Sequence, residues 1–594
     1  MRRMVMLAGT ALASIPAWAD VPAALDRVPN DALVVAAIRD LDQFDTRVGK
    51  LMADLKVPQD AGEMAMAFKL MKTPGLNRKG SMALALLQDP KDKAKEAKPA
   101  KKDEMEDEAE EDGEQGPLVL IVPVSDQAAF LKAFGAEAGK GVIELKTPDG
   151  EESPFDGPMF AKDIGGGYLA LGPVKEIVEK FEGAAGHLAA HKAALGAVGT
   201  RIADTTDTVI ISNIQALGPK MKEGFQGFKQ QMQMAMMMGG QQNNEKAVEM
   251  VESTFNAFSR DATVGVMGVG IDDAGVWLDL GAQFKEGSES AKLCQTKGKA
   301  AAFAGRLPDQ PYLATFSVDT SGANVKHMMT ELAKLSDGKT PSLFDNFTKG
   351  IDKLDGTGVV IGQTAGMLSG GLLANGVIYA QTSDPAGYAK AMRDSITGMN
   401  GKTDNGMTFK TTYEPAAAEI SGVKVDKYAA QITVDPNSPN GQQSQQGVMM
   451  MYGPAGGPSG FVATLDNAVV MTMAQNTPLM TMALDAAKGK KTLGENSDYK
   501  NAGAKLQADR TAEGYLNVKP LMDLAAMFMG GGGNTPASLP PIAMGITNNN
   551  GGMHTRLYVP KSVIAAIKDM AGGGEAEAED GAAPAEKDSK PPRF

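Results

Sequence analysis

The sequence predicts an α+β protein built as a tandem duplication, with two similar lobes that each have a largely antiparallel sheet covered by helices. Short apolar runs of strand length alternate with helical patterns along the chain. The order of these patterns in residues 20–300 recurs in residues 301–570. Candidate hairpins occur in both parts, which favours antiparallel pairing within each sheet. We therefore expect one α+β repeat in each range.

The clearest repeat is a strand-to-helix junction. An apolar run precedes residues 125–134 in the first half and residues 383–392 in the second half. Asp126 and Asp384 stand just before the helical pattern in each copy, where a carboxylate can accept hydrogen bonds from the first free N–H groups of a helix. These two residues are therefore predicted to be structural caps.

Four further elements recur in the same order. They are an opening turn with a strand, a strand pair before a helix, a capped helix after a strand, and a hairpin with a closing helix. The matched segments are 27–38 with 306–318, 160–181 with 461–484, 211–217 with 515–521, and 264–294 with 542–570. Asn213 and Asn517 occupy the capping position in the third pair. The second half also carries extra residues, among which 435–447 have the composition of a disordered loop.

Each half opens on a short motif with proline and aspartate, Val28-Pro29-Asn30-Asp31 in the first and Leu307-Pro308-Asp309 in the second. With the strand–Ser-Asp–helix junction, this order resembles a family of uncharacterised bacterial exported proteins, catalogued only as a domain of unknown function, whose tandem α/β repeats open on Leu-Pro-x-Asp. The first copy departs from that motif by its Val, and the second lacks the spacer residue. The resemblance spans residues 27–570 and implies architecture without any activity.

The N-terminus predicts export. Arg2 and Arg3 precede an apolar run at residues 4–15, which is too short to span a bilayer. Small residues before Asp20 predict cleavage between Ala19 and Asp20, so residues 1–19 would be a signal peptide. The mature protein is then expected in the periplasm or outside the cell, and no later apolar run is long enough to predict a membrane span.

Two tracts are predicted to be disordered because they have almost no apolar residues to bury. The insert at 90–116 is rich in Lys and then in acidic residues, and the tail at 571–594 is rich in Gly, Ala, Pro and Glu. The chain has a formal net charge of −13, which argues against nucleic acid or anionic lipid as its main partner. A single cysteine, Cys294, excludes an internal disulfide and is expected to be packed.

Two clusters are weak candidates for a metal site. His187 and His191 lie one helical turn apart, but the segment lacks the Glu of a zinc protease. Met232 and Met236 have the same spacing in a Met-rich run, and thioether sulfur is a soft ligand that suits Cu(I). A lightly packed or exposed helix for the histidines, and packing or partner contact for the methionines, are the favoured explanations, so no cofactor is predicted.

The sequence contains no recognisable catalytic constellation. The Gly-Lys-Thr triplets at 338–340 and 401–403 lack the earlier Gly of a phosphate loop, and no Gly-x-Ser-x-Gly elbow occurs. The leading hypothesis is an exported, non-enzymatic binding or envelope scaffold protein, with an unknown envelope protein or small ligand held in a groove between the lobes. A periplasmic copper binder and an unrecognised hydrolase remain as alternatives.

Overall fold

The computed structural model describes residues 21–57, 70–88, 117–146, 158–238, 245–334, 353–364, 370–404, 406–438, 441–529 and 536–572. The predicted signal peptide with Ala19 and Asp20, the insert at 90–116 and the tail from residue 573 lie outside the described residues. Within the described part of the chain, no helix is both long enough and apolar enough to cross a membrane.

The first half contains the following elements in chain order. They are η1 (Ala23–Arg27), β1 (Val34–Ile38), α1 (Leu41–Asp54), β2 (Met82–Leu86), β3 (Leu118–Pro123), α4 (Gln127–Ala133), β4 (Val142–Leu145), β5 (Met159–Gly165), β6 (Tyr168–Gly172), α5 (Lys175–Lys180), α6 (Leu188–Thr205), β7 (Thr208–Asn213), α7 (Ile214–Met238), α8 (Glu245–Asp261), β8 (Ala262–Ile271), β9 (Gly275–Phe284) and α9 (Glu289–Leu293).

The second half contains the remaining described elements in chain order. They are α10 (Ala300–Ala304), β10 (Tyr312–Val318), α11 (Ala323–Lys334), β11 (Leu354–Gly362), β12 (Gly376–Thr382), α14 (Pro385–Gly398), β13 (Thr403–Asp404), β14 (Met407–Ile420), β15 (Val423–Val434), α15 (Gly441–Tyr452), η2 (Gly453–Ala455), β16 (Ser459–Thr464), β17 (Ala468–Thr472), α16 (Thr477–Ala487), η3 (Leu493–Glu495), α17 (Ser497–Gly503), β18 (Arg510–Leu516), α18 (Lys519–Met529), β19 (Ile542–Asn549), β20 (Gly552–Pro560) and α19 (Lys561–Gly572).

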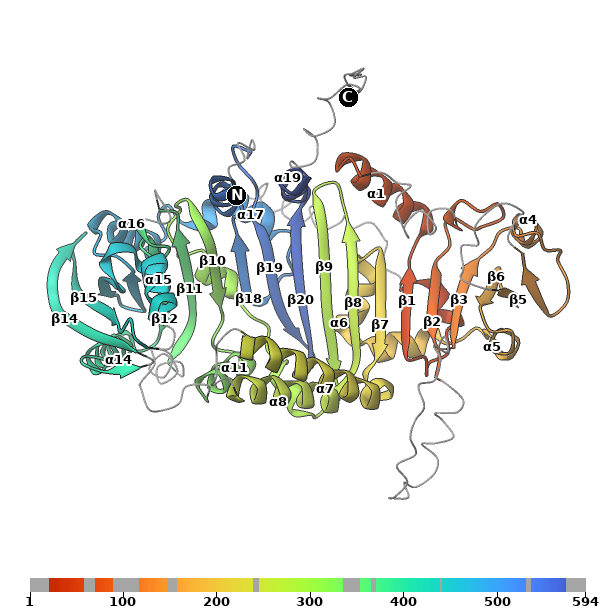
Figure 1. Ribbon diagram of the computed structural model, residues 1–594, viewed down its shortest axis with the longest axis horizontal. Helices are drawn as coiled ribbons and strands as arrows, with labels where there is room; N and C mark the ends of the chain where they lie inside the picture. The colour runs from red at the N-terminus through yellow and green to blue at the C-terminus, as the bar shows by residue number, and fades with distance from the viewer. Residues whose placement is uncertain are drawn as a thin grey trace, which may run out of the picture.

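The described strands form one 20-stranded antiparallel sheet that runs along the whole molecule (Figure 1). The spatial order is β4-β5-β6-β3-β2-β1-β7-β8-β9-β20-β19-β18-β10-β11-β12-β17-β16-β15-β14-β13. The α+β class is therefore confirmed. The expectation of two separate sheets is wrong, because the last strands of the two halves, β9 and β20, pair with each other in the centre.

The physical reason for this join is the free edge of each closing hairpin. A hairpin leaves one strand with unpaired N–H and C=O groups, and pairing two such edges satisfies both. The central pair runs from Gly275 opposite Pro560 to Gln283 opposite Gly552. The halves are thus joined by backbone hydrogen bonds, where the sequence led us to expect a groove between two lobes.

The two faces of the sheet are covered differently. On one face α6 packs against β8 and β9 so closely that a Cβ atom at Gly281 would lie 2.5 Å from Ile202 Cδ1. Leu280, the residue just before Gly281 in β9, points to the opposite face because side chains alternate along a strand. In Figure 1, this opposite face is bordered by α7 and α8 along one long edge and by α1 and α19 along the other.

A row of exposed apolar side chains crosses this opposite face. Directly paired residues of antiparallel strands point to the same side, so the register assigns them to one face. We call these residues the apolar stripe: Leu84, Met267, Leu280, Leu557, Met544 and Phe316, which are between 36% and 47% exposed. In Figure 1, β8, β9, β20 and β19 form the middle of the sheet, with α7 and α8 below them and α19 above.

The structure places the four capping residues at strand-to-helix junctions. Asp126 accepts a hydrogen bond from the N–H of Ala129 at 3.0 Å, and Asp384 accepts one from Gly387 at 2.9 Å. Asn213 and Asn517 accept hydrogen bonds at 3.2 Å from N–H groups at the starts of α7 and α18. Asp384 also pairs with Lys353, but both side chains are about half exposed, so this ion pair adds little.

Removing either capping carboxylate should lower stability modestly. We expect Asp126→Ala and Asp384→Ala each to reduce the free energy of unfolding by about 1 kcal/mol, because an N–H group at the helix start loses its acceptor. Urea denaturation followed by circular dichroism measures this change. Asp126→Asn keeps an acceptor and serves as the control; an equal loss in that variant would contradict the capping role.

Candidate functional site: an apolar cavity under helix α14

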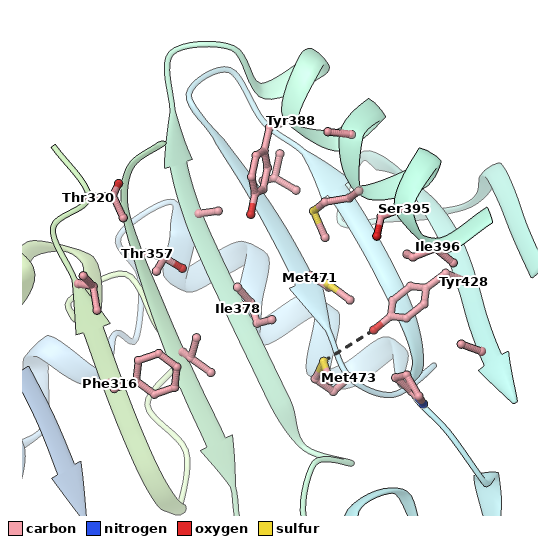
Figure 2. A pocket seen from close by; sticks show the side chains of 18 of the residues that line it. Phe316, Thr320, Thr357, Ile378, Tyr388, Ser395, Ile396, Tyr428, Met471 and Met473 are labelled. Carbon is pink, nitrogen blue, oxygen red and sulfur yellow. Dashed lines mark hydrogen bonds between the residues drawn. The ribbon is translucent and has the colours of Figure 1, made fainter. Parts of the chain in front are cut away.

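A cavity of about 500 Å³ lies in the second half, between the sheet and the helices that cover it there (Figure 2). Strands β10, β11, β12, β15 and β17 contribute lining residues on the sheet side, and α14 and α11 contribute them on the helix side. Its lining residues are Phe316, Val318, Thr320, Val325, Met328, Thr357, Val359, Ile378, Ala380, Tyr388, Ala391, Met392, Ser395, Ile396, Met399, Tyr428, Ala430, Tyr452, Pro458, Val469, Met471 and Met473.

The sequence of α14 explains which side chains reach the cavity. The helix begins after its cap Asp384 and presents Tyr388, Met392 and Ser395 at spacings of four and three residues. Residues at these spacings share one face of a helix. Figure 2 shows Tyr388 and Ser395 directed from α14 toward the strands, opposite Ile378 and Met471.

The polar groups in the lining are mostly satisfied by the protein itself. The Tyr428 hydroxyl donates to the carbonyl of Thr472 at 3.0 Å, and the Thr357 hydroxyl donates to the carbonyl of Tyr379 at 3.1 Å. Ser395 differs from them, because its Oγ atom is buried without a hydrogen-bond partner among the described residues. A buried hydroxyl without a partner costs free energy, so this atom is available to a ligand that offers a donor or an acceptor.

None of the lining residues carries a charge. Burial raises the pKa of Tyr388 to about 12, so its phenol stays neutral at physiological pH. Such a lining can hold a molecule by apolar contact and can orient it with one or two hydroxyl groups. The lining residues include no charged side chain that could act as a general base.

The structure gives His191 a packing role. Its Nε2 atom lies 2.9 Å from the carbonyl oxygen of Val28, and burial lowers the pKa of the imidazole. His187 is the residue immediately before α6, four positions earlier. Among the described residues, no group of three or more His, Cys, Asp or Glu side chains is placed to hold a metal ion.

The two methionines of the copper hypothesis both lie in α7. Met232 is half-buried, and the side chain of Met236 lies outside the described part of the structure. Cys294 is buried at the end of α9, and burial raises the pKa of its thiol to about 11. The thiol is therefore protonated at neutral pH, which agrees with the packing role expected from the sequence.

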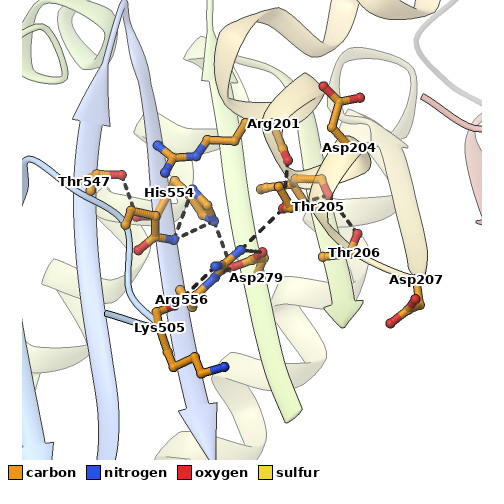
Figure 3. Close-up of polar contacts among 12 residues, drawn as sticks. Arg201, Asp204, Thr205, Thr206, Asp207, Asp279, Lys505, Thr547, His554 and Arg556 are labelled. Atoms are coloured by element: carbon orange, nitrogen blue, oxygen red, sulfur yellow. Dashed lines mark hydrogen bonds and ion pairs between the residues drawn. The ribbon is translucent and has the colours of Figure 1, made fainter. Parts of the chain in front are cut away.

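A buried polar cluster at the centre of the sheet was not predicted (Figure 3). Asp279 on β9 accepts hydrogen bonds from Arg556 Nε at 2.7 Å and Arg556 Nη2 at 2.6 Å. The other partner of Asp279 is His554, whose Nε2 atom lies 2.9 Å from Oδ1. We assign the remaining ring nitrogen, Nδ1, as the acceptor of the Gln507 side-chain amide at 3.2 Å.

This cluster joins the two halves, since Asp279 comes from β9 and His554 and Arg556 come from β20. Burial alone would raise the pKa of Asp279, but the hydrogen bonds from Arg556 and His554 outweigh burial and hold that pKa below its usual range. His554 faces an amide where a Ser-His-Asp triad needs a hydroxyl nucleophile. We therefore regard the cluster as a structural connection.

The sequence held a partial signal for this cluster. Asp279 interrupts the apolar run of β9, and His554 and Arg556 lie two positions apart in β20, between the apolar residues Met553 and Leu557. A charged residue inside a buried strand requires a partner of opposite charge. The missing information was that β9 and β20 are neighbours.

Comparison with known proteins gives little further information. No known protein family matches the chain, and no curated protein does so either. Solved structures of TP0453, a Treponema protein, are distantly similar to part of it. Crystal form III shares 8% identity with a TM-score of 0.23 and covers 45% of this chain and 97% of that chain. For crystal form IV the identity is 7%, the TM-score 0.22, and the coverage 44% of this chain and 95% of that chain. We therefore infer function from the cavity itself.

Proposed function

We propose that this protein is an exported, non-enzymatic binding protein that holds an apolar small molecule in the cavity under α14. The observation that carries the proposal is the cavity of about 500 Å³ with an uncharged lining and one unpaired buried hydroxyl, that of Ser395. Ligand sites typically have volumes of about 300–1,000 Å³ and few, well-placed polar groups. The export part of the proposal rests on the N-terminal pattern ending at Ala19.

The energetic argument favours occupancy by an apolar molecule. Interiors are normally close-packed, and a cavity of this size forfeits many dispersion contacts. Apolar cavities hold water poorly and take up apolar ligands. Removing apolar surface from water stabilises a complex by about 25 cal/mol per Å², so a ligand that fills the cavity gains from its own surface and from the lining.

We further infer that the two halves are a tandem duplication, and that the cavity under α14 belongs to the second copy. Read outward from the β9–β20 pair, the strand orders are β9-β8-β7-β1-β2-β3-β6-β5 and β20-β19-β18-β10-β11-β12-β17-β16. Phe130, four residues after its cap, is fully buried and packs 5.2 Å from Phe134 between ring centroids. Tyr388, four residues after the matching cap, lines the cavity. This difference supports a ligand-binding role for the second half.

Filling the cavity should abolish ligand binding. We expect Ala391→Trp on α14 to weaken binding of the neutral fluorescent probe N-phenyl-1-naphthylamine by about tenfold or more, because the indole occupies the ligand's space; tenfold corresponds to about 1.4 kcal/mol. Fluorescence titration of the full chain measures the dissociation constant. Ala386→Trp, on the exposed side of the same helix, is the matched control and should bind as the unaltered protein does.

Ser395→Ala separates the apolar and polar parts of this test. It should leave binding of a long-chain alkane unchanged and weaken binding of the alcohol of the same length, because only the alcohol has a hydroxyl that can bond to Oγ. Equal probe binding by the unaltered protein and Ala391→Trp would place the probe elsewhere and contradict the proposed function.

A further inference from the structure

The apolar stripe, from Leu84 to Phe316, is a second surface that calls for an explanation. Single exposed apolar residues are common, but several of them gathered on one face mark an interaction site. Here the side chains come from strands far apart in the sequence and converge on one face of the sheet. The four central residues are Met267, Leu280, Leu557 and Met544, and each is more than a third exposed.

The stripe runs directly into the cavity. In the register of the sheet, Leu557 is opposite Met544, Met544 is opposite Gly514, and Gly514 is opposite Phe316. Phe316 is in turn opposite Val359, and Val359 is opposite Ile378. Phe316, Val359 and Ile378 line the cavity, so the stripe and the cavity floor are one surface that is open in the middle of the sheet and covered by α14 at its end.

We propose that the stripe binds the hydrocarbon chain of an amphiphile and forms one continuous path with the cavity, which receives the end of that chain. The proposal rests on the proposed function and adds the class of ligand and its route of entry. A single flexible hydrocarbon chain explains both features, because it can fill the partly covered cavity and lie along the open stripe. The flat sheet face of a second copy would cover the stripe and leave the cavity empty.

The chemistry of the stripe fits hydrocarbon better than a peptide strand. Every strand that carries a stripe residue is paired on both sides, so none offers a free edge to which a peptide could add. Its side chains are aliphatic, thioether or phenyl groups, which make apolar contacts only. The methionines Met267 and Met544 are flexible and polarisable, which suits a ligand without a fixed shape.

The test compares the binding of a long and a short ligand to the full-length protein. We expect the double variant Leu280→Gln/Met544→Gln to bind octadecanoic acid about tenfold more weakly than the unaltered protein and to bind octanol, which fits within the cavity, equally well. Both side chains are exposed, so the variant should fold. Ile567→Gln, an equally exposed apolar residue on α19, is the matched control and should change neither affinity.

The outcomes separate the two proposals. If the double variant binds both ligands as the unaltered protein does, while Ala391→Trp binds neither, the cavity alone is the site and the stripe proposal fails. If the unaltered protein binds neither ligand, the proposed function fails as well. A dimer in solution that becomes monomeric in the double variant would identify the stripe as a subunit interface and overturn the proposal.

A second pair of measurements distinguishes whether the hydrocarbon chain belongs to a free amphiphile or to a membrane lipid. Uptake of free radiolabelled octadecanoic acid supports the proposal with a soluble amphiphile as ligand. Extraction of radiolabelled phosphatidylcholine from vesicles of that lipid supports it with a membrane lipid as ligand. In either case, a photoreactive diazirine at mid-chain should crosslink to stripe residues, and crosslinks confined to the cavity would contradict the proposal.

Discussion

Asp279→Asn is expected to lower the free energy of unfolding by about 3–5 kcal/mol, the usual cost of breaking a buried ion pair by removing one partner. The carboxylate of Asp279 is fully buried and accepts two hydrogen bonds from Arg556. The amide of asparagine has nearly the same shape but no charge, so the guanidinium would remain in the interior without its counter-ion. Because the pair spans β9 and β20, the loss falls on the junction between the two halves.

Chemical denaturation of the full chain measures this change, and Asp273→Asn provides the control. Asp273 lies six residues earlier and pairs with Lys50 at 2.6 Å, but its side chain is 83% exposed. An exposed pair contributes about 0–1 kcal/mol, so the control should be nearly neutral. Equal effects of the two substitutions would show that the central cluster does not stabilise the junction.

The same variant should change the response to acid. The pKa of Asp279 is lower in the folded protein than in the unfolded chain, where a carboxyl of this type has a pKa of about 3.9. Its contribution to stability is therefore fully present above about pH 4 and is lost as the pH falls through the lower, folded value. The unaltered protein should lose stability below about pH 4, and Asp279→Asn should lose less over that range.

Local features of the fold followed from the sequence. The caps Asp126 and Asp384, the strands around them and the closing hairpins depend on residues close together in the chain, and patterns of spacing and capping report such contacts well. The expected loop at 435–447 was wrong in part, because α15 begins at Gly441. The Gln-rich start of α15 has little apolar periodicity, so the sequence does not predict a helix there. Tertiary contacts between α15 and β15 override this weak local preference.

Long-range features did not follow from the sequence. The pairing of β9 with β20 could not be predicted, because the alternation of apolar and polar residues along a strand is the same whichever strand lies beside it. The cavity is harder still to predict, because its lining residues have the same composition as a packed core. Tyr388 and Met392 predict a buried helix face, but whether that face meets filled or empty space depends on volumes contributed by β11, β12 and β17.

Substitutions of Phe303 and Gly356 are expected to be strongly coupled in their effects on stability, and a double-mutant cycle measures that coupling. Phe303 on α10 is 1% exposed, and a Cβ atom at Gly356 on β11 would lie 2.0 Å from its ring. Phe303→Ala is expected to cost about 3–5 kcal/mol through the cavity that it leaves. Gly356→Leu is expected to cost about 1–3 kcal/mol through overpacking.

The double variant should be more stable than the sum of these losses predicts, because the leucine can occupy the space that the ring has left. We expect a coupling energy of about 1–3 kcal/mol from denaturation of the four proteins of the cycle. Gly398→Ala is the control for the second position, since nothing lies within 4 Å of its would-be Cβ atom, and it should combine additively with Phe303→Ala. Additive losses for Phe303→Ala and Gly356→Leu would mean that the ring of Phe303 on α10 does not pack against Gly356 on β11. The strand β11, which lines the cavity, would then not be supported by α10.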